Sequence, residues 1–402
     1  MKILVVCQYY HPEPFRVSNI CEELVRRGHE VQVITGYPNY PEGILYDGYG
    51  KGKKIDEVIN GVKVHRCYTI PRKTGKVYRM LNYLSFAFSS KLYAASKKCV
   101  ASDGKPFDVV LVNQLSPVIM AEAAITYKCK HKVDAALYCL DLWPESLVAG
   151  GISRDSIIYK VFKKWSKRIY RKMDRIGVTS KSFIQYLSKN FGVNEKKITY
   201  LPQYAEGVFT NIPAKEQTED GVFDFMFAGN IGEIQGVDTI IYAAEKLQSS
   251  PVRFHIVGGG TDLERLQKLA QDKDLKNVIF HGRKPLEEMP KYYAMADAML
   301  VTMKADPVLS LTLPGKVQSY MAAGKAIIGA IDGETAKVIE EAKCGFCSKS
   351  GDTESLVDNL CAFVNSKEEQ KKMCENAAKY YAANFHIKAF FDVLERKVMK
   401  VQ

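Results

Sequence analysis

The chain has 402 residues, of which 47% are hydrophobic and 25% charged, and its net charge at pH 7 is +12. This composition is typical of a folded globular protein and excludes a disordered chain, and the length predicts two domains. The basic excess lies in one half, because residues 1–203 carry a net charge of +16 and residues 204–402 carry −4. That asymmetry favours an anionic partner for the first domain, either nucleic acid or a membrane surface.

The first domain opens on a short apolar segment at residues 2–7, which is typical of a buried strand and not of a secretory signal peptide. A helix is predicted over residues 17–27, because its apolar residues recur at helical spacing and Gly28 follows. Further strands are predicted at residues 30–35, 62–66, 109–112, 135–139 and 175–179. Strands that alternate with helices predict a parallel, doubly wound α/β sheet over residues 1–203.

Residues 204–220 are polar and lack periodicity, which predicts a linker. Strands then recur at residues 223–228, 252–257, 278–281, 298–301 and 326–329, and predict a second α/β domain over residues 221–384. We expect residues 385–402 to form a helix that crosses back to the first domain. The two Rossmann-like domains should face each other across a cleft, with ligands at the carboxyl ends of the strands.

The cysteines and histidines do not form a metal-binding pattern. Ten cysteines without a predicted signal peptide indicate free thiols in a reducing compartment. The closest pair, Cys344 and Cys347, has no second pair at zinc-like spacing. The seven histidines are scattered, with no pair at helical metal-ligand spacing, so no protein-held metal is expected.

The most informative segment runs from residue 309 to residue 330. Its pattern predicts a tight turn, a helix with Lys316 at its start, a stop at Gly324 and a buried strand. A helix start offers unpaired N–H groups and the positive end of the macrodipole, which together bind phosphate. Loops at residues 229–236 and 258–260 carry glycines that allow close approach to a ligand. These features of the second domain favour a nucleotide-type ligand.

Four ordered motifs carry a resemblance to a known family: residues 37–43, 141–146, 229–232 and 314–325. On these residues the chain resembles the family-4 glycosyltransferases of the GT-B fold. It is most similar to the bacterial subgroup that builds O-antigen, capsule and colanic acid and includes N-acetyl-L-fucosaminyltransferases. The resemblance implies a retaining hexosyl transfer from a UDP-sugar, bound by the second domain, to an acceptor bound by the first. The sugar it implies is an N-acetylated deoxyhexose such as N-acetyl-L-fucosamine, with no cofactor. We also expect no metal, because the Asp272–Asp274 pair lies on a polar turn.

Some positions depart from the family pattern. Many members place an arginine and a lysine in the loop at 230–235 and two glutamates eight positions apart, whereas this chain has Asn230, Gln235, Leu311 and Ser319 there. Lys316 is therefore expected to be the chief cation at the donor diphosphate.

The candidate site residues fall into three groups. The predicted catalytic residues are Lys316, Asp141 and Asn230, and a helix N-cap is the alternative interpretation of Asp141. The predicted donor-binding residues are Gly229, Gly232, Gln235, Gly258, Gly259, Arg283, Thr312, Leu313, Pro314, Gly315 and Ser319. The predicted acceptor-side residues are Tyr10, Arg16, Trp143 and Glu145, and a solvated arginine in the first turn of a helix is the alternative interpretation of Arg16.

Two segments of the first domain favour a membrane as the anionic partner. Residues 155–173 predict a basic amphipathic helix, or alternatively a core-packed helix with a solvated basic face; its apolar side is Ile158, Val161, Phe162, Trp165 and Ile169. Residues 77–95 are rich in aromatics but shorter than a membrane span. We expect a cytoplasmic protein held peripherally at the inner face of the cell membrane, with a polyprenyl-diphosphate-linked saccharide as acceptor and no nucleic-acid partner.

Two other functions stay open at this point. A UDP-sugar epimerase or hydrolase of the same fold would need no acceptor and no basic first domain. A non-enzymatic anion-binding module for nucleic acid would explain the basic half, but it would leave the loops of the second domain unused.

Overall fold

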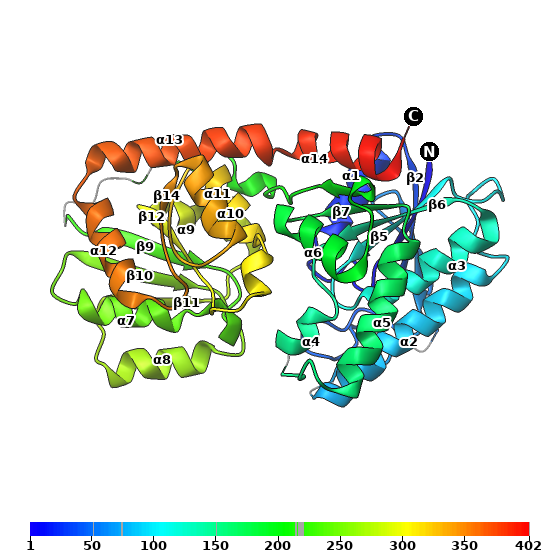
Figure 1. Ribbon diagram of the computed structural model, residues 1–402, viewed down its shortest axis with the longest axis horizontal. Coiled ribbons are helices and arrows are strands. Elements are labelled where there is room, and N and C mark those ends of the chain that lie inside the picture. The colour runs from blue at the N-terminus through cyan, green and yellow to red at the C-terminus, as the bar shows by residue number, and fades with distance from the viewer. Residues whose placement is uncertain (51, 74, 150, 214, 216–220, 402) are drawn as a thin grey trace. The chain divides into compact units, whose positions relative to one another are not determined.

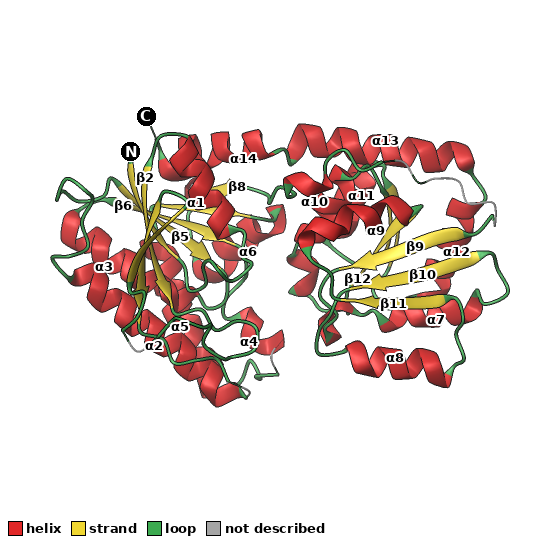
Figure 2. Ribbon diagram, turned by 180° about the vertical axis from the view of Figure 1, so that it is seen from behind, coloured by secondary structure: helices red, strands yellow, loops and turns green. Residues whose placement is uncertain are grey.

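The computed structural model describes residues 1–50, 52–73, 75–149, 151–213, 215 and 221–401. They form two compact units: Met1–Leu201 together with the residues from Asp392 onward, and Pro202–Phe391. In each unit helices cover both faces of a sheet (Figure 1, Figure 2). None of the helices within the described ranges combines the length and apolarity needed to cross a bilayer.

The first unit is built on an eight-stranded sheet with the order β3-β4-β2-β1-β5-β6-β7-β8. All neighbouring strands pair in parallel except β3 and β4, which form an antiparallel pair. The strands are β1 Lys2–Val6, β2 Glu30–Gly36, β3 Asp56–Ile59, β4 Val62–Cys67, β5 Val109–Gln114, β6 Asp134–Cys139, β7 Arg175–Val178 and β8 Ile198–Tyr200. The helices are α1 Val17–Arg26, α2 Lys76–Ala95, α3 Glu122–His131, α4 Glu145–Ala149, α5 Ile157–Lys172 and α6 Lys181–Phe191.

The second unit has a six-stranded, fully parallel sheet with the order β11-β10-β9-β12-β13-β14. Its strands are β9 Phe223–Ala228, β10 Val252–Val257, β11 Val278–Gly282, β12 Ala298–Thr302, β13 Ala326–Ala330 and β14 Gly345–Ser348. Its helices are α7 Asp238–Lys246, α8 Leu263–Asp272, α9 Met289–Met295, α10 Gly315–Ala322, α11 Glu334–Ala342, α12 Thr353–Val364 and α13 Lys367–Asn384. The central strands read as apolar runs because both of their faces are covered.

Part of the predicted linker belongs to the core of the second unit. Ala205 and Phe209 are buried against its helices and strands, and Lys215 forms ion pairs with Asp224 and Asp297. The stretch was predicted to be a linker because most of its residues are polar, and its few apolar residues show no periodic pattern that would predict their burial. Residues 214 and 216–220 of the predicted linker lie outside the described residues.

The end of the chain packs on the first unit. Helix α14, Ile387–Val393, continues into a π-helical segment, Leu394–Met399. Glu395 forms ion pairs with Arg27 and His29, and the Arg175 guanidinium donates to the Val398 carbonyl at 2.6 Å. The last turns are therefore tied to α1 and β7 by charged contacts that connect distant parts of the sequence.

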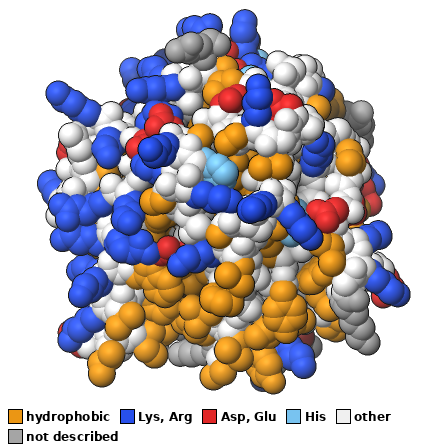
Figure 3. Space-filling view, turned by 90° about the vertical axis from the view of Figure 1, so that its right-hand side faces the viewer, with side chains coloured by type: hydrophobic (Ala, Val, Ile, Leu, Met, Phe, Trp, Pro, Cys, Tyr) orange, Lys and Arg blue, Asp and Glu red, His pale blue; other side chains and the backbone are white. Residues whose placement is uncertain are grey.

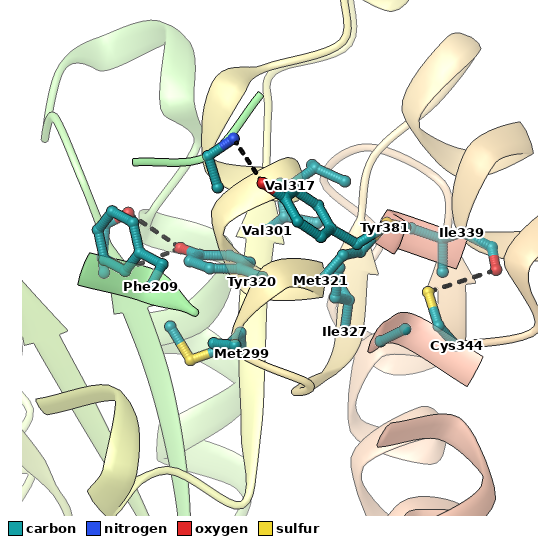
Figure 4. Close-up of a cluster of buried hydrophobic side chains, with 14 of the residues drawn as sticks. Phe209, Met299, Val301, Val317, Tyr320, Met321, Ile327, Ile339, Cys344 and Tyr381 are labelled. Atoms are coloured by element: carbon teal, nitrogen blue, oxygen red, sulfur yellow. Dashed lines mark hydrogen bonds between the residues drawn. The ribbon is translucent and has the colours of Figure 1, made fainter. Parts of the chain in front are cut away.

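Helix α10 is held against the end of β9 by a tyrosine. Tyr320 is fully buried, and its hydroxyl accepts from the Ala228 N–H at 3.0 Å and donates to the Ala228 carbonyl at 2.9 Å. Figure 4 shows Tyr320 with Val317 and Met321 of the same helix inside the apolar cluster of this unit. The two hydrogen bonds satisfy backbone groups at the point where the strand pairing ends.

Removing the Tyr320 hydroxyl should therefore destabilise the protein. We expect Tyr320→Phe to lower the free energy of unfolding by about 1–3 kcal/mol, because a buried N–H and a buried carbonyl lose their partner. Chemical denaturation measures the change. Tyr242→Phe on α7, where the side chain is 38% exposed, is the matched control, and equal stability of the two variants would contradict the role given to Tyr320.

Candidate functional site

Two loops meet at the carboxyl end of the sheet in the second unit. The loop after β9 is hydrogen bonded to the loop after β10, with the Gly229 N–H on the Val257 carbonyl and the Ile231 N–H on the Gly259 carbonyl, both at 2.9 Å. Gly258 has a φ of +152°, and a Cβ there would lie 1.9 Å from the Gly229 oxygen. Only glycine allows this approach, so the predicted glycine loops are joined into one platform.

Lys316 lies on this platform. It is the second residue of α10, one turn before Tyr320, so the contact between Tyr320 and β9 also brings Lys316 to the end of that strand. A Cβ at Gly229 would lie 3.1 Å from the Lys316 Cε and Nζ atoms. The ammonium stands 3.7 Å from the ring centroid of Phe227, which favours a cation–π contact.

The amine of Lys316 is buried and lacks a hydrogen-bond acceptor among the described residues. Burial lowers the pKa of Lys316 from 10.5 to about 7. A buried donor of this kind is costly unless a partner satisfies it. An anion seated on the glycine platform at the start of α10 would supply the missing acceptor and the opposite charge.

Several other predicted donor-side residues support the loops. The Gln235 side-chain oxygen accepts from the Gly232 N–H at 3.0 Å and from the Asn230 amide at 3.2 Å. Gln235 therefore closes its own loop, while Asn230 is exposed. The exposed Arg283 stands beside Gly259, since a Cβ there would lie 3.5 Å from the Arg283 Cβ.

The residues around the start of α10 are held by local contacts. The Thr312 hydroxyl donates to the Leu309 carbonyl at 2.7 Å, and the Ser319 hydroxyl donates to the Gly315 carbonyl at 3.3 Å. Leu313 is buried and Pro314 is the N-cap residue. Ser319 is also buried, and its hydroxyl is used inside the helix. The structure thus brings together Gly229, Gly258 and Lys316 and gives Leu313 and Ser319 packing roles.

In the first unit, Asp141 follows β6 at the carboxyl end of the sheet. Its carboxylate accepts from the Ser146 hydroxyl at 2.5 Å. Burial raises the pKa of Asp141, although hydrogen bonds from Ser146 and Ser116 act in the opposite direction. Helix α4 begins only at Glu145, so Asp141 is not its N-cap. A carboxylate with a raised pKa suits proton exchange with a hydroxyl.

The other predicted acceptor-side residues are mostly structural. Trp143 is 1% exposed, and Tyr10 is fully buried. The buried Glu145 carboxylate accepts from Tyr159 at 2.6 Å, from Tyr186, and from Arg154 at 3.0 Å. Burial acts to raise the pKa of Glu145, but these hydrogen bonds outweigh it and lower the pKa. Arg16 is half-buried at the N-cap of α1.

Arg72 and Arg79 were not among the site residues predicted from the sequence. They line a cavity of about 170 Å³ with Tyr83, Ser116, Trp143 and Ser146, next to Asp141. The only sequence signal is a run of cations in front of the aromatic segment. Among the described residues, no three His, Cys, Asp or Glu side chains form a group that could hold a metal ion.

Two family models match the chain one after the other. Residues 16–203 match Glycosyltransferase Family 4, and residues 208–380 match Glycosyl transferases group 1. The chain belongs to the family-4 glycosyltransferases. The matches divide this glycosyltransferase near the boundary between its two units.

Relatives and solved structures agree with this assignment. The glycosyltransferase is 26% identical over 350 residues to the putative colanic acid biosynthesis glycosyl transferase WcaI of Escherichia coli K12, covering 81% of this chain and 82% of WcaI. It is similar in fold to sucrose-phosphate synthase from Thermosynechococcus elongatus, with a TM-score of 0.77 at 14% identity over 100% of each chain. HepE from Anabaena in complex with UDP-glucose gives a TM-score of 0.69 at 13% identity, covering 98% of this chain and 97% of HepE. The two-domain GT-B fold is common to them.

The buried amine predicts a pH-dependent stability difference between wild type and Lys316→Met. Below pH 7 the amine is charged in both the folded and the unfolded protein, so the wild type bears the whole free-energy cost of burying that charge. Between pH 7 and 10.5 only the unfolded chain keeps the proton, so wild-type stability rises relative to the variant, by at most about 1.4 kcal/mol per pH unit. The variant should therefore be the more stable protein at pH 6, with an advantage that shrinks towards pH 10.

Chemical denaturation at several pH values measures this difference. Lys268→Met on α8, where the side chain is exposed, controls for loss of a surface lysine. A stability difference for Lys316→Met that does not vary with pH would contradict the lowered pKa of the buried amine.

Proposed function

We propose that this glycosyltransferase moves a sugar from a UDP-sugar to a lipid-linked saccharide during synthesis of a surface polysaccharide such as O-antigen or capsule. The observation that carries the proposal is the buried, unpartnered amine of Lys316 beside the glycine platform. A diphosphate is the ligand whose charge and oxygen atoms fit that amine and the N–H groups at the start of α10. The UDP-glucose bound in HepE and the colanic acid pathway in the name of WcaI support the same donor and product classes.

In this mechanism the donor diphosphate lies over the start of α10. Negative charge develops on the departing phosphate as the bond to the sugar breaks, and Lys316 with the backbone N–H groups stabilises that charge. The first unit presents the acceptor, whose hydroxyl oxygen forms the new bond to the sugar. Asp141, whose pKa is raised by burial, orients that hydroxyl and takes up its proton. Retention of configuration and the absence of a metal or cofactor requirement are part of the proposal and follow the family resemblance.

The donor sugar in this proposal is an N-acetylated deoxyhexose such as N-acetyl-L-fucosamine. This choice rests on the sequence resemblance to the subgroup that uses such sugars. Thermal shift with a panel of UDP-sugars tests it, because a ligand that binds only the folded protein raises its melting temperature. A larger shift with UDP-glucose or UDP-galactose than with the N-acetylated deoxyhexose donor would overturn the choice.

The proposal places the first unit against the inner face of the cell membrane. Helix α5 exposes Lys160, Lys163 and Lys167, and it also exposes the apolar residues Ile158 and Val161. Figure 3 shows hydrophobic side chains gathered at one end of this face of the molecule, with Lys and Arg around them. Of the apolar side predicted for this helix, Phe162 and Ile169 instead pack inward. Each cation near an anionic leaflet contributes about 1 kcal/mol, so a few oriented lysines hold a protein there reversibly.

Replacing Lys316 should remove transfer without unfolding the protein. We expect Lys316→Ala to lower turnover by about two to three orders of magnitude, because it removes a charge that acts on the departing phosphate. The assay follows UDP release with and without lipid-linked acceptor, which also separates transfer from hydrolysis. Lys268→Ala is the control, and a near-normal rate for Lys316→Ala with an unchanged melting curve would refute the assignment.

Membrane binding should depend on charge. Flotation with anionic vesicles should recover the protein at low salt, and recovery should fall at high salt. The triple variant Lys160→Glu, Lys163→Glu, Lys167→Glu should stay in the unbound fraction, whereas the same three changes at Lys268, Lys276 and Lys291 of the second unit should bind like wild type. Failure to bind at any salt concentration, or equal binding to neutral vesicles, would contradict this part of the proposal.

A further inference from the structure

We propose that the first unit holds the prenyl diphosphate part of its acceptor along helix α2, with the diphosphate at Arg72 and Arg79 and the prenyl chain in the groove between α2 and α5. The inference rests on the proposed function, because it assumes a lipid-linked acceptor. Beyond the proposed function, it specifies where the lipid binds and which residues distinguish a lipid-linked acceptor from a soluble saccharide.

Helix α2 carries an apolar stripe on its outer face. Exposed apolar side chains recur at intervals of three or four residues, so they lie on one side of the helix; they are Val77, Leu81, Leu84, Phe88 and Leu92, with exposed fractions of 71%, 40%, 37%, 65% and 56%. A helix in a soluble protein ordinarily turns such a stripe inward. The outward stripe indicates an apolar ligand or surface.

A groove of about 920 Å³ runs between this stripe and α5. Leu84, Ala87 and Phe88 line it from α2, and Val161 and Trp165 line it from α5. Its one carboxylate, Glu122, is already occupied by hydrogen bonds from the Trp165 indole and the Arg168 guanidinium. The groove therefore offers an apolar channel, and its cations are Lys91, Lys164 and Arg168.

The cavity at Arg72 and Arg79 supplies the charge for a head group. Within the described residues neither guanidinium forms an ion pair, whereas Arg66, Arg154 and Arg175 of the same unit all pair with carboxylates. Arg72 is half-buried and its guanidinium lies 5.7 Å from the Tyr40 ring centroid. Two guanidinium groups line this small cavity, the half-buried Arg72, which also hydrogen bonds Tyr9, and the exposed Arg79. Such groups match the oxygen atoms of a diphosphate.

The cavity and the groove share one wall. Tyr83 lines the cavity, and the next residue of α2, Leu84, lines the groove. On the other side of this wall, the Trp143 ring of the cavity packs edge-on against the Phe162 ring, with 5.5 Å between the ring centroids. The Phe162 ring in turn stacks on the Trp165 ring of the groove, with 5.9 Å between the centroids. An anionic head joined to a single hydrocarbon chain fits this arrangement. The apolar groove does not suit a nucleic acid, and a bare leaflet would not need two arginines at one cavity.

The chain has two tryptophans, Trp143 at the cavity and Trp165 at the groove, so their fluorescence reports on both ends. We titrate the full-length protein with farnesyl diphosphate and, separately, with farnesol and with inorganic pyrophosphate. Farnesyl diphosphate should give a saturable change in emission, with each of the other two probes binding at least about tenfold more weakly. Lys316→Ala should leave this signal unchanged, which separates it from binding at the donor diphosphate site.

The cavity at Arg72 and Arg79 and the groove between α2 and α5 together form the proposed lipid tract. The variants test these two parts separately. Arg72→Gln and Arg79→Gln should each weaken farnesyl diphosphate about tenfold or more, because each removes a charge-assisted hydrogen bond, and should leave farnesol binding unchanged. Phe88→Ser and Val161→Ser should weaken both prenyl probes and leave pyrophosphate unchanged. Arg396→Gln and Val58→Ser, at exposed positions outside the tract, are the matched controls.

Three outcomes overturn the inference: no saturable farnesyl diphosphate signal, equal affinities in the tract variants and the controls, or binding only when anionic vesicles are present. If transfer to a lipid-linked acceptor continues with unchanged KM in Arg72→Gln and Arg79→Gln, the tract is wrong and the proposed function stands. If the tract binds farnesyl diphosphate but the enzyme transfers to no lipid-linked acceptor, the proposed function fails and the tract stands.

Discussion

Tyr320 bonds both backbone groups of Ala228, and this contact sets where α10 begins relative to the sheet of the second unit. The position of Lys316 follows from this contact, because Lys316 is one turn before Tyr320 on the same helix face and so lies over the end of β9. The space there is bounded by the Phe227 ring and by a glycine that leaves room for the amine. A side chain at residue 229, or a different start for α10, would displace the Lys316 amine from this space. The donor chemistry thus depends on a strand end, a tyrosine and a glycine that do not react.

The sequence was informative where local pattern and tertiary position coincide. Both sheets were predicted, because parallel strands buried on both faces read as apolar runs between helices. The short edge strands β3, β8 and β14 were missed, since edge strands carry mixed side chains. Lys316 was predicted as the chief cation from its place at a helix start and from the absence of the family's usual cations at residues 230 and 235. Its burial and its lowered pKa depend on Phe227, which the pattern presents as an ordinary strand residue.

For the acceptor-side residues the sequence pattern said less about the packing of the side chains, for a physical reason. A position just after a strand places a residue near the carboxyl end of the sheet but does not say whether its side chain turns inward. Trp143 and Glu145 turn inward and form the support for the loop that carries Asp141. Arg72 lies just before α2 and Arg79 lies in its first turn. Only the fold brings these two residues close to the loop that carries Asp141. Spacing along the chain cannot show such convergence.

The lowered pKa of Lys316 has a consequence for the catalytic cycle. With a pKa of about 7, the amine of the empty enzyme is held between its neutral and charged forms near neutral pH. In the proposed mechanism a bound diphosphate raises that pKa and favours the charged amine. When the product leaves, the proton can leave with it. On the proposed mechanism the empty enzyme thus needs no permanent cation in its apolar interior, and the spent nucleotide is held less tightly than a fixed charge would hold it.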